Sequence, residues 1–177
     1  MIPAFVNLVS LALLLETSWP GGTSKQREKK LDILEKLACD HVKQKELCQT
    51  LLATSGDTKQ RRDTYEQLKT ELVAHAAAEE MAFYSPLMSD VDGVEIARHS
   101  VAEHKDLDDL IKKVDDADIA SSAWLQHFKN LAHKVEHHVD EEEADVFPVA
   151  KKLLSQQERD RIGAEFVDAK DKQKQQS

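Results

Sequence analysis

Four long stretches of this chain repeat apolar residues at steps of three and four, which is the spacing of an amphipathic α-helix. Short polar segments separate them, and they cover about 24–54, 57–86, 94–114 and 124–153. Gly and Pro number only 5 and 4, and aromatic residues make up 5%, which disfavours a β-sandwich or barrel with its many turns. The sequence therefore predicts an all-α fold, an up-down-up-down four-helix bundle.

Local signals predict where these helices begin and end. Asp57 can cap the second helix, and we expect Pro148 to kink or end the fourth. Ser155-Gln156-Gln157-Glu158 has the form of a capping box, which predicts a short fifth helix that ends near Lys170. The polar tail from Gln173 to Ser177 is expected to fray.

With 177 residues the chain accommodates one full domain, and we divide it into three parts. These are an apolar leader and linker at 1–23, the bundle at 24–154, and the short helix with its polar tail at 155–177. Residues 5–15 are mostly apolar, but they are too few to span a membrane, and no Lys or Arg precedes them. We expect a flexible or packed extension or a start assigned too far upstream, with export by a signal peptide as the alternative.

Charge and cysteine content bound the partners and the compartment. The net charge of −9 and the pI near 5.4 offer no attraction for phosphate backbones, so we expect no nucleic acid partner. Cys39 and Cys48 are nine positions apart in one predicted helix, roughly 13 Å, and are too distant to pair. Reduced thiols favour a cytoplasmic location. The oligomeric state is left open.

The second half of the predicted bundle repeats the first at an offset of 63 positions. Polar residues follow this offset, and so do apolar ones such as Leu51 with Val114 and Tyr84 with Phe147. The polar pairs are His41 with His104, His75 with His138, and Glu79 with Glu142. This pattern indicates the duplication of a helical hairpin.

These six polar residues occupy positions that the periodicity assigns to the core. A buried ionised carboxylate is costly unless a cation or a metal compensates it, and the stripes around these positions contain almost no Lys or Arg. Counting from the predicted turns also places all six side chains near one level of the bundle. We therefore predict that a metal site is formed by His41, His75, Glu79, His104, His138 and Glu142. The alternative is a set of core histidines that hydrogen-bond to the two glutamates.

Four imidazoles and two carboxylates suit two metal ions, each held by two histidines and bridged by both carboxylates. Ligands of this type fit iron, manganese or zinc and leave the choice among the three open. His137 with Glu141 forms a competing His-x3-Glu pair, but the apolar stripe favours His138. The remaining histidines lie off the stripes and are expected to be solvated: His99, His127, His133 and His137.

The neighbouring residues receive supporting roles at most. Glu80, Glu141 and Glu143 are expected to be solvated, although one of them could hydrogen-bond to a ligand histidine. Tyr84 and Phe147 are expected to wall the site or pack in the core.

Ferritin-like diiron proteins use Glu-x-x-His, which this sequence lacks. The chain instead resembles the hemerythrin-like proteins, specifically the HHE cation-binding domain, from about Leu31 to Leu154. The motifs that carry the resemblance are Asp40-His41, His75-Ala-Ala-Ala-Glu79-Glu80 with Phe83-Tyr84-Ser85-Pro86, Glu103-His104, and His138-Val-Asp-Glu-Glu142-Glu143 with Val146-Phe147-Pro148.

The resemblance implies a non-haem diiron centre that binds dioxygen, nitric oxide or a related small ligand, with iron favoured over manganese or zinc. Oxygen-carrying hemerythrins have a further histidine four residues from another on the third helix, but here the positions four from His104 are Ser100 and Asp108. Asp108 could fill the open position weakly. The departure makes redox turnover, such as peroxide removal or repair of damaged iron centres, an alternative to ligand binding and sensing. Repair proteins of this family usually carry an N-terminal cysteine module, and none is seen before Lys25. A purely structural bundle is the third hypothesis.

Overall fold

A computed structural model describes residues 31–176 of the protein. The predicted leader and linker at 1–23 and the predicted start of the first helix at Ser24 lie outside these residues. The elements, in order, are α3 (Ile33–Leu52), α4 (Lys59–Ala78), the π-helix η1 (Glu79–Phe83), α5 (Tyr84–Leu87), α6 (Val91–Asp115), α7 (Ser122–Glu141), the π-helix η2 (Glu142–Val146), α8 (Phe147–Leu153) and α9 (Gln156–Lys174).

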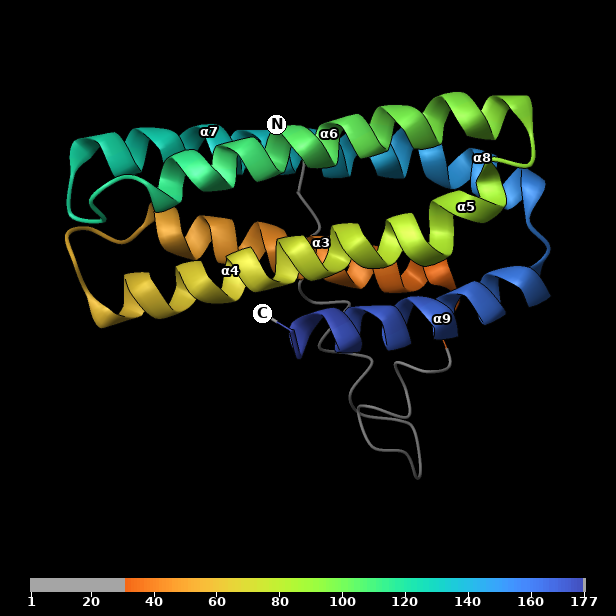
Figure 1. The fold of residues 1–177 in the computed structure, drawn as a ribbon, viewed down its shortest axis with the longest axis horizontal. Coiled ribbons are helices and arrows are strands. Elements are labelled where there is room, and N and C mark those ends of the chain that lie inside the picture. The colour runs from red at the N-terminus through yellow and green to blue at the C-terminus, as the bar shows by residue number, and fades with distance from the viewer. Residues whose placement is uncertain (1–30, 177) are drawn as a thin grey trace, which may run out of the picture. The chain divides into compact units, whose positions relative to one another are not determined.

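Within residues 31–176 four helical rods run up, down, up and down (Figure 1). The second rod is α4 continued by η1 and α5, and the fourth is α7 continued by η2 and α8. These rods confirm the predicted all-α four-helix bundle. No helix in this part of the chain combines the length and apolar character needed to cross a membrane.

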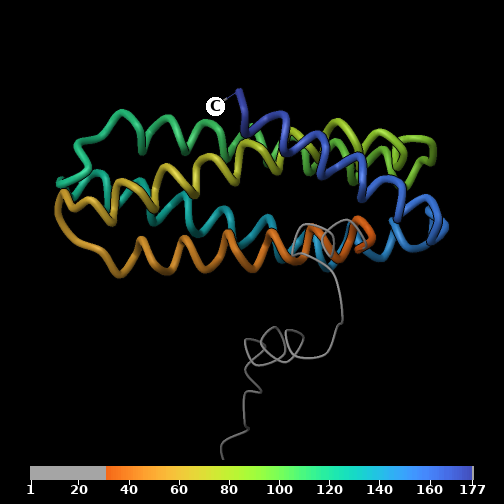
Figure 2. Tube along the Cα trace, turned by 90° about the horizontal axis from the view of Figure 1, so that it is seen from below, coloured from red at the N-terminus to blue at the C-terminus, as the bar shows by residue number. Residues whose placement is uncertain are grey.

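The fifth helix, α9, is longer than predicted. It crosses α3 and α4 obliquely on the outside of the bundle and continues to Lys174, so the prediction of an end near Lys170 was wrong (Figure 2). Ile162 and Phe166 bury its apolar face in the core, and Lys174 binds the carboxylate of Glu71 at 2.7 Å. These tertiary contacts order a segment that its polar sequence would leave frayed.

The helix ends show which local signals operate. Asp57 does not cap α4; the Thr58 side chain accepts from the backbone N–H of Arg61, while Asp57 pairs with Arg62. The capping box at Ser155 is confirmed. The third rod begins at Val91 instead of near Val94, with Asp90 as its cap.

Gly93 lies in the first turn of α6, where the backbone at the end of α5 passes very close to it. A Cβ atom at Gly93 would stand 2.0 Å from the backbone oxygen of Leu87. Only glycine permits this contact between α5 and α6.

The two π-helices were not predicted. Each begins at one of the core glutamates, Glu79 or Glu142, so they too are 63 positions apart. Pro148 does not end the fourth rod, because it lies near the start of α8 and the helix continues to Leu153. A π-turn of this kind often marks a functional site in a helix.

The apolar core consists of two clusters. One contains Phe83, Phe147 and Phe166, and the other contains Trp124 and Phe128. Along each of the four rods, the predicted ligand histidine lies between residues of the first cluster and residues of the second. The candidate site is therefore a polar layer enclosed between two apolar layers.

Candidate metal centre

The structure brings the six predicted site residues together in this layer. Each rod supplies one histidine, and each π-helix supplies the glutamate at its first position. All six are buried, with exposed fractions between 0% and 4%. Their ligand atoms fall into two groups, each with all atoms within 4.8 Å, and Glu79 belongs to both: His41, His75, Glu79 and Glu142; and Glu79, His104 and His138.

The inward-facing atoms lie close to one another. The Nε2 atom of His41 is 3.1 Å from Oε2 of Glu142. Oε2 of Glu79 is 3.3 Å from Nε2 of His75 and 3.2 Å from Nε2 of His104, so this carboxylate spans the two hairpins. Among residues 31–176, none of these inward nitrogen atoms or of these Oε2 atoms has a hydrogen-bond partner.

The outward-facing nitrogen of every one of these histidines meets a carboxylate instead. The Nδ1 distances are 2.8 Å from His41 to Glu143, 3.1 Å from His75 to Asp40, 2.9 Å from His104 to Glu80, and 2.9 Å from His138 to Glu103. These four carboxylates obey the same repeat, with Asp40 matching Glu103 and Glu80 matching Glu143. An outer carboxylate of this kind fixes the tautomer and orientation of a ligand histidine.

Sequence reasoning foresaw only part of this outer set. Glu80 and Glu143 are each 43% exposed, as expected, and both of them, instead of one, hydrogen-bond to a ligand histidine. Asp40 and Glu103 were missed as partners of His75 and His138. The 63-residue offset between these two carboxylates was the available signal.

The residues around the centre also have defined places. His137 is half exposed, which leaves His138 as the inward histidine of α7. Asp108 is exposed and does not reach the site, so the proposed filling by Asp108 was wrong. His99 and His133 are exposed, as expected, and His127 is partly exposed.

Residues 32–150 match the family described as Hemerythrin HHE cation binding domain. The chain belongs to this family. A crystal structure of a hemerythrin HHE cation binding domain-containing protein from Mycobacterium kansasii superimposes with a TM-score of 0.75 at 19% identity, covering 82% of this chain and 89% of that one. At this identity the likeness concerns the fold.

A curated relative from Nostoc sp. (strain PCC 7120 / SAG 25.82 / UTEX 2576), named DNA nickase, is 26% identical over 151 residues. The match covers 85% of this chain and 42% of the relative, so this chain spans about two fifths of that protein's length.

The protonation pattern of the HHE domain shows why these residues suit a cation. An ionised carboxylate only accepts hydrogen bonds, so each Nδ1–H donates outward. In its neutral form each imidazole then directs an Nε2 lone pair at the oxygens of Glu79 and Glu142. Lone pairs and negative oxygens repel one another in a buried site unless a cation lies between them. Imidazole nitrogens and carboxylate oxygens are donors that fit a metal ion. The outer carboxylates fit it as well, because they orient the ligand histidines.

The raised pKa values of the buried residues also show that this site favours positive charge. Burial lowers the pKa of His75, but the carboxylates of Glu79 and Asp40 outweigh burial and raise this pKa to about 9. Burial likewise opposes the charge on His104, and Glu79 and Glu80 raise its pKa to about 10. Burial and the charge of Glu79 raise the pKa of Glu142. In the absence of a metal, protons supply the positive charge.

Aromatic rings wall the centre, as predicted, and they repeat with it. Phe147 stacks on His41 with ring centroids 6.0 Å apart, and Tyr84 lies 5.7 Å from His104. The hydroxyl of Tyr84 donates to Oε1 of Glu142 at 3.2 Å. Burial and the nearby carboxylates raise the pKa of Tyr84 well above its usual range, so this hydroxyl keeps its proton.

The two sides of the HHE domain differ in their cover. On the first hairpin, the ring of Phe166 from α9 lies 5.7 Å from His75, and Lys170 pairs with Asp40. On the second hairpin, a hollow of about 360 Å³ reaches the centre, and its lining includes Ser100 and Glu142. The centre is therefore less covered on the side of α6 and α7 than on the side of α9.

Proposed function

We propose that this HHE protein holds two iron ions with His41, His75, Glu79, His104, His138 and Glu142, and that it binds dioxygen or a related small ligand such as nitric oxide. The observation that carries this proposal is the set of four buried Nε2 atoms that face carboxylate oxygens and have no hydrogen-bond partner within the described part of the chain. Two histidines in each of two groups, joined by Glu79, support two ions instead of one.

The donor chemistry supports iron within a short list of metals. All six donors are nitrogen or oxygen atoms, which suits iron, manganese or zinc. Cys48 is buried in the second apolar cluster, where burial raises its thiol pKa to about 12, and it is not one of the donors. The resemblance to hemerythrin-like proteins favours iron among the three.

A diiron centre supplies reversible one-electron chemistry and open positions for small ligands. The chain's own residues control access and protons. Ser100 stands four residues before His104 and lines the hollow, where its small side chain leaves room that a histidine would fill. The Tyr84 hydroxyl holds a proton beside Glu142, and the rings of Phe147 and Phe83 keep bulk water away.

Metal analysis of the purified protein tests this proposal. The protein is expressed with added iron, purified in air and measured for metals per chain, and its visible spectrum is recorded with and without azide. We expect about two irons per chain and an absorption that azide changes. The His75→Ala variant should lose metal, whereas His127→Ala should match the wild type. One zinc per chain, or equal metal in all three proteins, would contradict the proposal.

Redox turnover at the same centre is the second candidate function. Ser100 and the hollow beside Glu142 favour it, because they leave space for peroxide at the centre. Disproportionation converts two molecules of hydrogen peroxide to two of water and one of dioxygen, without a further reactant. Peroxide consumption that scales with bound iron and disappears in Glu142→Ala would support turnover, and a rate equal to that of free iron would exclude it. Repair of damaged iron centres is a further form of this candidate.

Neither DNA cleavage nor export is part of the proposal. The net charge of −9 gives little attraction for a polyanion, and the candidate ligands are buried. Cys48 is a buried thiol without a disulfide, which supports a reducing, cytoplasmic location.

A further inference from the structure

The two hairpins carry different side chains on their outward faces, behind the equivalent outer carboxylates Asp40 and Glu103. Behind Asp40, the repeat positions are Lys36, Ala74 and Ala78. Ala74 and Ala78 are 1% and 0% exposed on a helix that α9 covers, and α9 approaches Lys36 closely at Gly163. This face is a packing surface.

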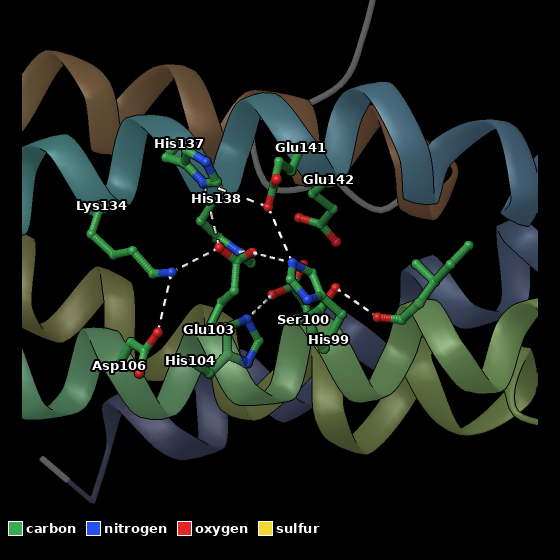
Figure 3. A network of polar contacts seen from close by, with 12 residues as sticks. His99, Ser100, Glu103, His104, Asp106, Lys134, His137, His138, Glu141 and Glu142 are labelled. Atoms are coloured by element: carbon green, nitrogen blue, oxygen red, sulfur yellow. Dashed lines mark hydrogen bonds and ion pairs between the residues drawn. The ribbon is translucent and has the colours of Figure 1, made fainter.

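The corresponding positions behind Glu103 hold metal-binding side chains. Moving 63 positions along the chain replaces Lys36, Ala74 and Ala78 with residues on α6 and α7, namely His99, His137 and Glu141. Figure 3 shows these three side chains converging on Glu103. The second hairpin thus departs from the repeat and carries two imidazoles and two carboxylates on the face that is equivalent to the one under α9.

Three of these side chains, His99, Glu103 and Glu141, offer ligand atoms that all lie within 4.8 Å of one another, and His137 lies beside Glu103 and Glu141. Nε2 of His99 is 3.2 Å from Oε2 of Glu141 and 4.0 Å from Oε2 of Glu103. Nδ1 of His137 is 3.5 Å from both Oε2 of Glu141 and Oε1 of Glu103. In tetrahedral zinc sites, ligand bonds of about 2.0–2.2 Å separate neighbouring ligand atoms by roughly 3.3–3.5 Å. Three of the four separations, at 3.2 and 3.5 Å, lie near this value, and the separation between His99 and Glu103 is 4.0 Å.

Access and charge also suit a cation. The side chains of His99 and His137 are 63% and 51% exposed, and the adjoining hollow is lined by the further carboxylates Glu95 and Asp145. Lys134 is the nearby positive group, with Nζ 2.9 Å from Glu103 and 3.2 Å from Asp106. When a metal binds Glu103, Lys134 can keep its ion pair with Asp106.

We propose that His99, Glu103, His137 and Glu141 form a second, partly exposed site for a divalent transition-metal cation. This site is separate from the buried centre and goes beyond the function proposed for it. The two are connected through Glu103, which also accepts a hydrogen bond from His138.

Zinc titration of the protein with its buried centre loaded tests this site. Loosely bound metal is removed by desalting, and Zn²⁺ binding is measured by calorimetry and equilibrium dialysis. We expect one additional Zn²⁺ per chain. The double variant His99→Ala/His137→Ala should weaken this binding about tenfold or more, because outer contacts alone are worth that much in metal sites. His133→Ala removes an exposed imidazole from the same helix and should bind zinc as the wild type does.

Two results would overturn the second site. One is that the wild type takes up no additional zinc, and the other is that the double variant takes up as much as the wild type. Iron content per chain, measured before each titration, distinguishes this outcome from failure of the buried centre, because zinc uptake reports on the second site only when the buried centre is already loaded. Thermal unfolding of each variant, followed by circular dichroism, checks that the bundle remains folded.

Discussion

The hairpin of α3 and α4 lies under α9, whereas the hairpin of α6 and α7 leaves the equivalent face partly open. Toward the centre the two hairpins match in their histidines, glutamates, outer carboxylates and π-turns. Away from the centre they differ: alanines face α9 on one side, and imidazoles face solvent on the other. The comparison teaches that the repeat holds where the buried centre constrains it and is lost on the outward faces, where one hairpin packs against α9 and the other carries exposed imidazoles.

The largest expected effect is the loss of bound metal when a core glutamate is replaced, and it should differ between Glu79 and Glu142. Glu79 lies 3.3 Å from His75 and 3.2 Å from His104, whereas the Glu142 carboxylate contacts His41. Glu79→Ala should therefore remove nearly all bound metal, and Glu142→Ala should remove less. Metal content per chain measures this difference. Equal loss in the two variants would show that the glutamates are equivalent.

Removal of the α9 cover should cost the next largest amount. Phe166 is 2% exposed and packs on His75, so Phe166→Ala should lower the free energy of unfolding by about 3–5 kcal/mol. Phe166→Leu preserves most of the volume and should cost less than about 1.5 kcal/mol. Chemical denaturation of both variants gives these values, and a small, equal loss would mean that α9 contributes little to the first hairpin.

The pH dependence of stability should differ between the metal-free and metal-loaded protein. The folded pKa values of His75 and His104 are raised to about 9 and about 10, above the usual value of 6.5. The metal-free protein therefore binds more protons when folded, and its stability should fall between pH 6.5 and 10, by on the order of 3 kcal/mol for His75. Bound metal replaces these protons and should flatten the curve.

Thermal unfolding with and without a chelator across this pH range provides the measurement. The same slope in both forms would indicate that the metal does not bind these imidazoles.

The smallest expected effect concerns the outer carboxylates. Asp40→Asn and Glu103→Gln each remove the charge behind one histidine and should weaken metal binding at the buried centre by about 10–100-fold. The two variants should differ in one respect, because only Glu103→Gln also affects the additional zinc site. Competition with a chelator of known affinity measures the first effect, and zinc titration measures the second. Loss of the zinc site in Asp40→Asn would refute this distinction.

The four rods and the buried layer could be predicted because residues that face the core recur in the sequence at steps of three and four. His75, Glu79 and the residues that match them stand on apolar stripes, and the cost of burying a carboxylate makes such positions conspicuous. The outer carboxylates could not be predicted in this way. Asp40 and Glu103 meet histidines on the next helix, and no spacing within one helix encodes a contact between helices.

The remaining differences have similar physical causes. Each π-turn adds one residue to a helix without disturbing the three-and-four pattern enough to be recognised, so η1 and η2 were missed. The length of α9 depends on Lys170 and Lys174, which bind carboxylates on other helices. At the start of α4, Asp57 and Thr58 are both competent caps, and the ion pair of Asp57 with Arg62 leaves the cap to Thr58.

The two π-turns also carry information about the history of the chain. A π-turn corresponds to a helix that has gained one residue, and η1 and η2 stand at the same register of their hairpins. A single insertion in an ancestral hairpin, followed by duplication, accounts for both with one event instead of two. The common register of the two π-turns therefore fits the hairpin duplication that the 63-residue offset indicates.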